Sequence, residues 1–451
     1  MTPITDPYII SDKTVKEPPS ALYRQLAFLG PGFILSASIV GSGELIATTV
    51  LGAKAGFAAL WIILISCLAK VAVQLEFGKH AILTGETAMQ AFNKLPGLTL
   101  GKGKWIVWTI FLLAILKIVQ IGGILGGTVI VLNMLFSGFS TSTWTIITTL
   151  VVGALIFNGR YGWIEKFSLL MIAMFTILTI TSLISLRYTV YSFSFSDILD
   201  GLRFNLSGEI VGIAIGAFGI TGVASDEIIA YNYWCLEKGY ASYTGPRQET
   251  QEWKKRAQGW INIMYLDAFV AMIIYTVVTI AFYLLGAAVL HNRGDIPQGN
   301  QVIETIALIY TQSLGPGVKN VYLVGAFFAL FSSLFASLAA WTRLYADIFG
   351  QIGWIDFSNV DQRRKMIAIF AWLFPFTWAA AYLFIDSPVL MVLSGGVVGS
   401  FMLFIVIFAA LHFKYKRTTL VTSGLLYDTA FWISVISILG VGVYGIMKVI
   451  L

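Results

Sequence analysis

Two stretches that combine small residues with carboxylates interrupt long apolar runs, one in each half of the chain. The first lies in the run 27–52 and consists of Gly41, Ser42, Gly43 and Glu44. The second lies in the run 210–234 and consists of Ala224, Ser225, Asp226 and Glu227. A carboxylate at the centre of a membrane helix costs about 3 kcal/mol or more, and each glycine costs roughly 1 kcal/mol. Helices interrupted at corresponding points of two halves are typical of proteins that hold a small polar solute between the breaks.

Carboxylates beside freed backbone groups could bind a cation. If the first run unwinds at Gly41–Gly43, the N–H groups of the half-helix that begins near Glu44 point into the break. Glu44 and Asp226 are then candidate metal ligands, and with Lys117, near the middle of a later apolar run, they are candidates for a relay of protons or charge. Successive residues point about 100° apart on a helix, so we expect Asp226 to face the cavity and Glu227 to face protein.

The same residues also have a structural interpretation. Gly41 and Gly43 could let two membrane helices approach each other closely. Ser225 could cap the second half-helix, with Asp226 and Glu227 complementing its dipole in the first turn. Neither interpretation accounts for acidic residues in the membrane interior, which is why we favour a binding site.

Small residues interrupt two further runs. In the run 388–413, Ser394 and Gly395 predict either a third loosened segment or close helix packing. In the run 318–346, three serines at 332, 333 and 337 favour helix packing over ligand binding. The predicted substrate-binding set is Gly41, Ser42, Gly43, Glu44, Ala224, Ser225, Asp226, Glu227, Ser394 and Gly395.

The composition predicts that the chain is an all-α polytopic membrane protein, so these breaks are expected inside membrane spans. Of the 451 residues, 57% are hydrophobic and 12% are charged, which is about half the charged share of a soluble globule. Most of the apolar runs are long enough to cross a bilayer as helices. We predict eleven spans, at about 27–52, 57–78, 104–136, 143–158, 165–186, 210–234, 259–290, 318–346, 366–384, 388–413 and 429–450.

Several classes of function are not supported. The chain has no catalytic triad, nucleotide-binding loop or paired metal-histidine motif, so we expect neither an enzyme nor a bound cofactor. The net charge of +6 is expected in cytoplasmic loops and does not indicate nucleic-acid binding. The expected partners are the lipid bilayer and a small-molecule or metal-ion substrate.

The distribution of Lys and Arg predicts the orientation. With the N-terminus inside, the outer loops keep only Lys54, Arg187, Arg203, Arg293 and Lys319, and the cytoplasmic loops hold most of the others. We therefore expect an integral plasma-membrane protein with a cytoplasmic N-terminus and an external C-terminus. The predicted units are a cytoplasmic segment 1–26, inverted repeats 27–186 and 187–413, and a loop with the eleventh span at 414–451.

Several sequence landmarks resemble the Nramp (natural resistance-associated macrophage protein) family of divalent-metal transporters. They follow one another in the family's order: Gly30-Pro31-Gly32-Phe33, Gly52-Ala53-Lys54-Ala55-Gly56-Phe57 before Leu60-Trp61, Leu83-Thr84-Gly85, and Leu132-Asn133. The resemblance implies a LeuT-like fold of two inverted five-helix repeats plus an eleventh helix, and transport by alternating access.

The chain departs from the family at the presumed metal site. The family's Asp-Pro-Gly-Asn stretch corresponds to Gly41–Glu44, and its Met-Pro-His stretch corresponds to Ala224–Asp226. A family glutamine falls on Gly395, and the family's proton-transferring acids in the third span have no counterpart around 121–124. The thioether that suits soft transition metals is therefore missing, and proton coupling is expected to be weak or absent.

These departures leave four interpretations open. The leading one is a hard divalent cation such as Mg²⁺, which keeps several waters and suits an enlarged cavity. The second is a small amino acid or amine whose carboxylate binds the Gly41-Ser42-Gly43 loop, which also resembles the substrate loop of amino-acid/polyamine transporters. The third is Mn²⁺ or Fe²⁺ at a rebuilt site, and the fourth is a membrane scaffold in which Glu44 and Asp226 are structural.

Overall fold

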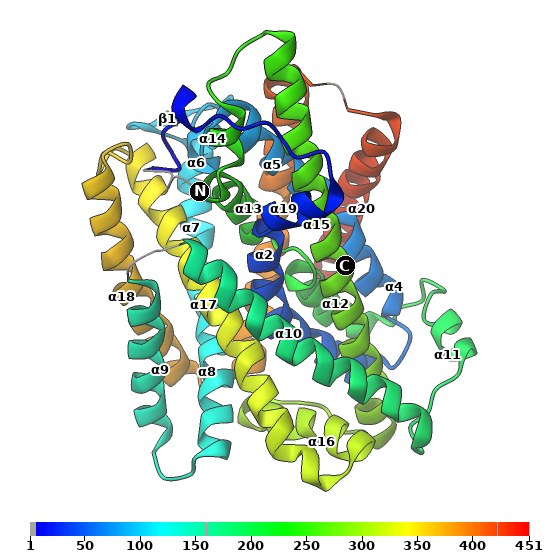
Figure 1. The fold of residues 1–451 in the computed structure, drawn as a ribbon. Coiled ribbons are helices and arrows are strands. Elements are labelled where there is room, and N and C mark those ends of the chain that lie inside the picture. The colour runs from blue at the N-terminus through cyan, green and yellow to red at the C-terminus, as the bar shows by residue number, and fades with distance from the viewer. Residues whose placement is uncertain (1–5, 158–160, 422, 451) are drawn as a thin grey trace.

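The computed structural model describes residues 6–157, 161–421 and 423–450 of the chain. Almost all of its regular structure is helical, and most helices run along the long axis of the molecule (Figure 1). A short hairpin of β1 (Thr99–Leu100) and β2 (Gly103–Lys104) pairs antiparallel in the loop that follows the second span. Helical spans are the expected result because a helix satisfies its own backbone hydrogen bonds inside a bilayer.

The predicted spans correspond to helices or helix pairs of the described residues. They are α2 (Pro31–Ile39) with the π-helix η3 (Val40–Thr48) and α3 (Thr49–Ala55), α4 (Leu60–Ala69) with α5 (Val71–Thr84), α7 (Trp105–Leu116) with α8 (Ile118–Leu135), α9 (Thr141–Ile156), α10 (Tyr161–Ser185), α12 (Gly208–Ile220) with α13 (Ser225–Lys238), α15 (Gln251–Leu285), α17 (Lys319–Gln351), α18 (Val360–Ile385), α19 (Pro388–His412) and α20 (Leu425–Ile450).

Within the described residues, nine of these elements are long and apolar enough to cross a membrane, and the bent α2–α3 pair makes a tenth. The remaining prediction corresponds to α9, an apolar helix of only 16 residues. Short helices lie outside the spans: α1 (Leu22–Gln25), α6 (Ala88–Phe92), α11 (Phe195–Asp200), α14 (Tyr240–Thr244) and α16 (Val302–Leu314). Helix α16 lies across the end of the molecule opposite to the N-terminal segment (Figure 1).

Two buried lysines lie where spans are interrupted. Lys70 separates α4 from α5, and Lys117 separates α7 from α8. Both side chains are fully buried. Each lysine therefore projects into the protein from a helix junction at membrane depth, where a charge needs a partner.

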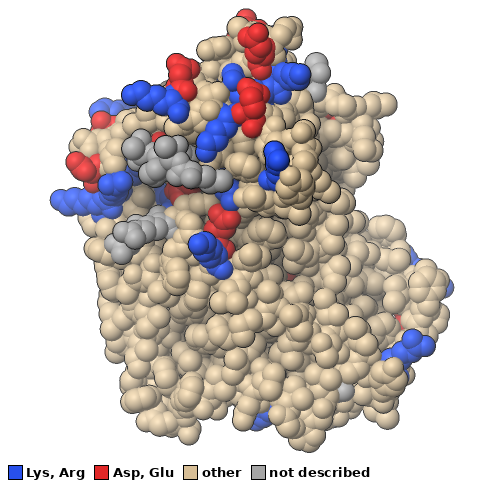
Figure 2. Space-filling model, in the orientation of Figure 1, with Lys and Arg blue, Asp and Glu red and all other residues tan. Residues whose placement is uncertain are grey.

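Charged side chains gather at one end of the molecule, above a broad band that is almost free of them (Figure 2). At this end Glu86 accepts hydrogen bonds from His80, Lys94 and Arg417. Burial opposes the charge on Glu86, but these hydrogen bonds outweigh it and hold the pKa of Glu86 well below its usual range. The N-terminal segment is attached at the same end, where the Arg363 guanidinium pairs with Asp6 at 2.7 Å.

Candidate functional site

The first interrupted span bends without unwinding. Its two halves, Pro31–Ile39 and Gly43–Ala55, meet at 41°, and the π-helix η3 runs through the bend. The predicted unwinding at Gly41–Gly43 is therefore wrong. A π-turn bonds i to i+5 and takes up an extra residue, which frees only a few backbone groups. The side chain of Ser42 lies outside the described part of the structure.

Serine hydroxyls of α17 satisfy the backbone groups that this bend frees. Ser333 Oγ accepts a hydrogen bond from the N–H of Gly41 at 2.9 Å and donates to the carbonyl oxygen of Ser38 at 2.5 Å. Ser332 Oγ donates to the carbonyl oxygen of Ala37 at 3.1 Å. Because Ser333 occupies the Gly41 N–H, that group is not free to bind the carboxylate of a solute.

The two glycines allow close contact with neighbouring backbone. A Cβ added at Gly41 would lie 2.8 Å from the Cβ of Ser333. A Cβ added at Gly43 would lie 2.7 Å from the carbonyl oxygen of Ile220, in the other interrupted span. The packing interpretation of Gly41 and Gly43 therefore agrees with the structure, because a larger residue at Gly41 would push the first interrupted span away from α17, and one at Gly43 would push the two interrupted spans apart.

The second interrupted span does unwind, as the sequence predicts. Helix α12 ends at Ile220 and α13 begins at Ser225, and Gly222 takes a φ of 62° in the connection. The break lies just before the predicted stretch, so Ala224 is the N-cap and Ser225 is the first helical residue. The prediction that Ser225 is the cap is wrong. The Glu227 carboxylate instead accepts a hydrogen bond from the N–H of Ala224 at 2.7 Å.

Three buried side chains hold this break, and we refer to Glu44, Ser66 and Lys70 as the span-six clamp. Lys70 Nζ donates to the carbonyl oxygens of Phe218 and Thr221 at 2.6 and 2.7 Å. Ser66 Oγ donates to the same carbonyl of Thr221 at 2.7 Å. The clamp thus supplies donors to the open carbonyl end of α12.

Glu44 supplies the matching acceptor. Its Oε1 accepts from the N–H of Gly222 at 3.0 Å, and its Oε2 accepts from the Thr48 hydroxyl at 2.8 Å. Electrostatic attraction also links the carboxylate to Lys70. Both carboxylate oxygens of Glu44 are therefore engaged in the fold, and the residue is fully buried.

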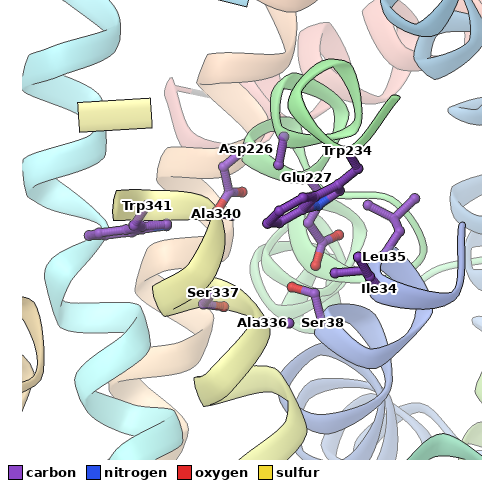
Figure 3. A pocket seen from close by; sticks show the side chains of 11 residues that line it. Ile34, Leu35, Ser38, Asp226, Glu227, Trp234, Ala336, Ser337, Ala340 and Trp341 are labelled. Carbon is purple, nitrogen blue, oxygen red and sulfur yellow. The ribbon is translucent and has the colours of Figure 1, made fainter. Parts of the chain in front are cut away.

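A small cavity of about 10 Å³ lies between α2, α13 and α17. That volume is about enough for one water molecule. Asp226, Glu227 and Ser38 face it, and the side chains of Ser38 and Glu227 point toward one another (Figure 3). The full lining is Ile34, Leu35, Ser38, Asp226, Glu227, Ala230, Trp234, Ala336, Ser337, Ala340 and Trp341.

Both acids of α13 line the cavity. The expectation that Asp226 faces it agrees with the structure, but the expectation that Glu227 faces protein is wrong. The two carboxylates leave the helix in different directions (Figure 3), and the Asp226 carboxylate forms an ion pair with Lys117 of the third span. This pair brings together two members of the predicted relay, whereas the third, Glu44, is in the clamp.

The other predicted residues lie outside this cavity. Gly41, Gly43, Glu44, Ala224 and Ser225 are absent from its lining. Helix α19 is continuous, so the prediction of a loosened segment there is wrong and the packing alternative holds. Gly395 packs against the Gln120 side chain, and the exposed Ser394 donates to the carbonyl of Met391.

Sequence reasoning missed some residues of the site. Ser38 and Trp234 line the cavity but resemble ordinary helix residues in the sequence, and Ser337, for which helix packing was favoured, lines it as well. Lys70 did give a signal, because a lysine inside an apolar run needs a partner. Within residues 6–157, 161–421 and 423–450, no group of three or more His, Cys, Asp and Glu side chains is arranged to hold a metal. A cation in the cavity would therefore take only part of its shell from carboxylates.

Comparisons with known proteins agree with this architecture. A family model described as "Natural resistance-associated macrophage protein-like" matches residues 32–448. The divalent metal cation transporter MntH of Mesorhizobium japonicum is 25% identical over 342 residues, which cover 73% of this chain and 69% of the relative. MntH of Staphylococcus aureus is 28% identical over 272 residues, and this chain spans only 56% of its length.

Solved structures support the same fold. A mutant of the Eremococcus coleocola manganese transporter matches with a TM-score of 0.66 at 15% identity, covering 96% of this chain and 90% of that one. MhsT in complex with L-phenylalanine matches with a TM-score of 0.56 at 15% identity, covering 95% and 100%. The predicted all-α, LeuT-like fold is thereby confirmed. With the family model matching nearly the whole length, the chain belongs to the Nramp family of membrane-embedded divalent metal transporters.

Proposed function

We propose that this chain moves a hard divalent cation, Mg²⁺ in the first place, by alternating access between the two interrupted spans. The observation that supports it most is the cavity, whose lining contains two carboxylates and two hydroxyls but no sulfur and no imidazole. Oxygen ligands suit Mg²⁺, Ca²⁺ and Mn²⁺, whereas soft ligands select other transition metals. Asp226 and Glu227 are the proposed charged ligands.

The small size of the cavity fits a closed state of the transport cycle. Mg²⁺ sheds its water shell reluctantly and usually keeps several waters on one or two carboxylates. A space for about one water molecule cannot hold such an ion with its shell, so the cavity has to widen when the cation enters. The α2 side of the bend is the proposed place of widening, because neutral serine contacts hold its last turn to α17.

We also propose that transport has weak or no proton coupling. The lining holds no histidine, and both carboxylate oxygens of Glu44 accept hydrogen bonds within the clamp. Of the predicted relay, Lys117 and Asp226 are joined as an ion pair. This pair can respond to a cation without exchanging protons with water.

Transport into proteoliposomes tests the proposal. Mg²⁺ and Mn²⁺ uptake are followed with a metal-sensitive dye, and internal pH is followed with a second dye. We expect Mg²⁺ uptake without acidification in the wild type, and its loss in Asp226→Asn. Asp361→Asn is a matched control, because Asp361 also lies in the first turn of a helix but is exposed. Uptake of Mn²⁺ but not Mg²⁺ would favour the transition-metal alternative, and acidification during uptake would contradict the lack of coupling.

One observation favours a second candidate, a small amine or amino acid. Trp234 and several apolar side chains share the cavity with the carboxylates, and an indole face attracts organic ammonium groups. The engagement of the Gly41 N–H by Ser333 weakens the part of this idea in which a substrate carboxylate binds the Gly41–Gly43 loop. Uptake of a radiolabelled amino acid that Mg²⁺ does not inhibit, with no metal uptake, would favour this candidate over the first.

We keep the predicted orientation as part of the proposal. The N-terminal segment lies at the end where Lys and Arg gather (Figure 2), which the positive-inside rule assigns to the cytoplasm. The C-terminus would then be external, and the repeats would span 27–186 and 187–413. Labelling of single cysteines introduced at exposed positions, in intact cells and in inverted vesicles, tests the two termini separately.

A further inference from the structure

Lys117 lies at a helix junction and directs its ammonium group toward Asp226, one of the residues that line the cavity. It stands between α7 and α8, is fully buried, and forms an ion pair with Asp226 across from it. A Cβ added at Gly399 of α19 would lie 3.7 Å from Lys117 Nζ and 3.7 Å from Ser225 Oγ. The absence of a side chain at Gly399 thus leaves room around the ammonium group.

The ion pair occupies the carboxylate that a transported cation needs. Asp226 is one of two acids in the cavity, and its side chain is 14% exposed. A buried charge whose partner is taken away is strongly destabilising. When a cation binds Asp226, the ammonium group of Lys117 must therefore find another acceptor.

The structure offers such an acceptor. Gln120 Oε1 and Ser225 Oγ are both buried and have no hydrogen-bond partner in the described structure. Gln120 lies one helical turn beyond Lys117, on the face that packs against Gly395. Ser225 lies beside Asp226 in the first turn of α13. These two unsatisfied oxygens flank the ion pair along the chain and offer the ammonium group a second position, since an unpaired buried acceptor costs free energy.

We propose that Lys117 is a tethered cation that competes with the transported ion for Asp226. In the empty carrier it neutralises Asp226, and in the loaded carrier it moves to the oxygens of Gln120 and Ser225. The inference rests on the proposed function of the cavity. Because the lysine carries one positive charge, a monovalent ion gains little by replacing it, whereas a divalent ion gains a stronger attraction to both carboxylates. Lys117 would therefore select for divalent cations and allow the empty carrier to reorient with a neutralised site.

Binding of Mn²⁺ to the purified full-length protein, measured by calorimetry in the presence and absence of K⁺, tests the inference. We expect Lys117→Met to raise the Mn²⁺ affinity roughly tenfold or more, a moderate effect for a close charge pair. We also expect K⁺ to inhibit binding in this variant but not in the wild type. Lys117→Arg keeps the charge and should not raise the affinity. Asp226→Asn should lower the affinity and remove the effect of Lys117→Met.

The outcomes separate the two hypotheses. If Asp226→Asn leaves Mn²⁺ binding unchanged in both backgrounds, the cavity is not the cation site and the proposed function fails together with the inference. If Asp226→Asn weakens Mn²⁺ binding but Lys117→Met leaves the affinity unchanged or lowers it, the cavity remains the proposed cation site and competition by Lys117 is wrong.

A second variant covers the case in which Lys117→Met does not fold. Gln120→Leu removes the second position of the ammonium group and touches neither carboxylate. We expect it to weaken Mn²⁺ binding roughly fivefold, within the range of measured couplings between sites, without changing the K⁺ response. Unchanged or tighter binding in Gln120→Leu would overturn the inference.

Discussion

The two interrupted spans satisfy similar backbone groups by different means. At the first, two carbonyls and one N–H bond to neutral serines of a single helix, α17. At the second, two carbonyls and one N–H bond to Lys70 of the second span and to Glu44, which lies in the η3 bend of the first span. Hydrogen bonds that involve a charged group are about twice as strong as neutral ones. We infer that α2, the half of span one before the bend, is the element that moves, and that η3 at Glu44 stays with the fixed break in span six.

Removing the positive side of the clamp should have the largest effect. In Lys70→Met, the carbonyl oxygens of Phe218 and Thr221 keep only Ser66, and Glu44 loses its electrostatic partner. We expect a loss of about 3–5 kcal/mol, because two buried carbonyl oxygens each lose a hydrogen bond from a charged donor. Thermal unfolding in detergent measures it, with Lys54→Met as a control because Lys54 is an exposed lysine. Equal melting temperatures of the two variants would refute the clamp.

Neutralising Glu44, the acidic member of the clamp, tests whether this residue belongs to the scaffold or to the cation site. Glu44→Gln keeps one acceptor oxygen but loses the charge that Lys70 and the Gly222 N–H favour, so we expect a loss of about 1–3 kcal/mol. Divalent-cation uptake per folded protein should change little in Glu44→Gln, whereas Asp226→Asn should abolish uptake per folded protein and should also lower stability, because it leaves the buried Lys117 unpaired. The reverse pattern would return Glu44 to the role of a metal ligand and make the two breaks one site.

The sequence was sufficient to predict the spans and the break between α12 and α13. Apolar runs must become helices in a bilayer, and the acids beside Ser225 could not belong to an uninterrupted span. The direction of Glu44 could not be predicted, because it depends on the π-turn. The extra residue of that turn rotates the side chains that follow, and the composition of Gly41–Gly43 favours unwinding and π-bonding alike.

The residues that line the cavity illustrate a second limit. Asp226 was predictable as a charge at a break, but Ser38 and Ser337 line the cavity only because of the bend of α2 and its packing against α17. Likewise, the pairing of Lys117 with Asp226 joins residues 109 positions apart. Such contacts depend on the packing of whole helices, which no local pattern in one sequence encodes.

A methyl group at the first break should have an intermediate effect. In Gly41→Ala, the new Cβ would overlap the carbonyl of Ala329 and the Ser333 side chain, and we expect a loss of about 1–3 kcal/mol from overpacking. Gly212→Ala is the control, since nothing lies near a Cβ at that helical glycine and about 1 kcal/mol of helix propensity is gained there. If Gly41→Ala were also neutral, α17 would not hold the bend closely, and the contrast between the breaks would weaken.

Removing the hydroxyl of Ser333 should have the smallest effect on stability, but it tests directly whether α2 moves. In Ser333→Ala the Gly41 N–H and the Ser38 carbonyl lose a partner, for a loss of about 1 kcal/mol. If α2 moves, this small loss should loosen it selectively, so its amides should exchange with deuterium faster while those of α12 do not change. Ser337→Ala, one turn along α17 and facing the cavity, should leave exchange unaltered. Faster exchange in both interrupted spans would mean that they open together, because a serine at one break would then control the charged clamp at the other.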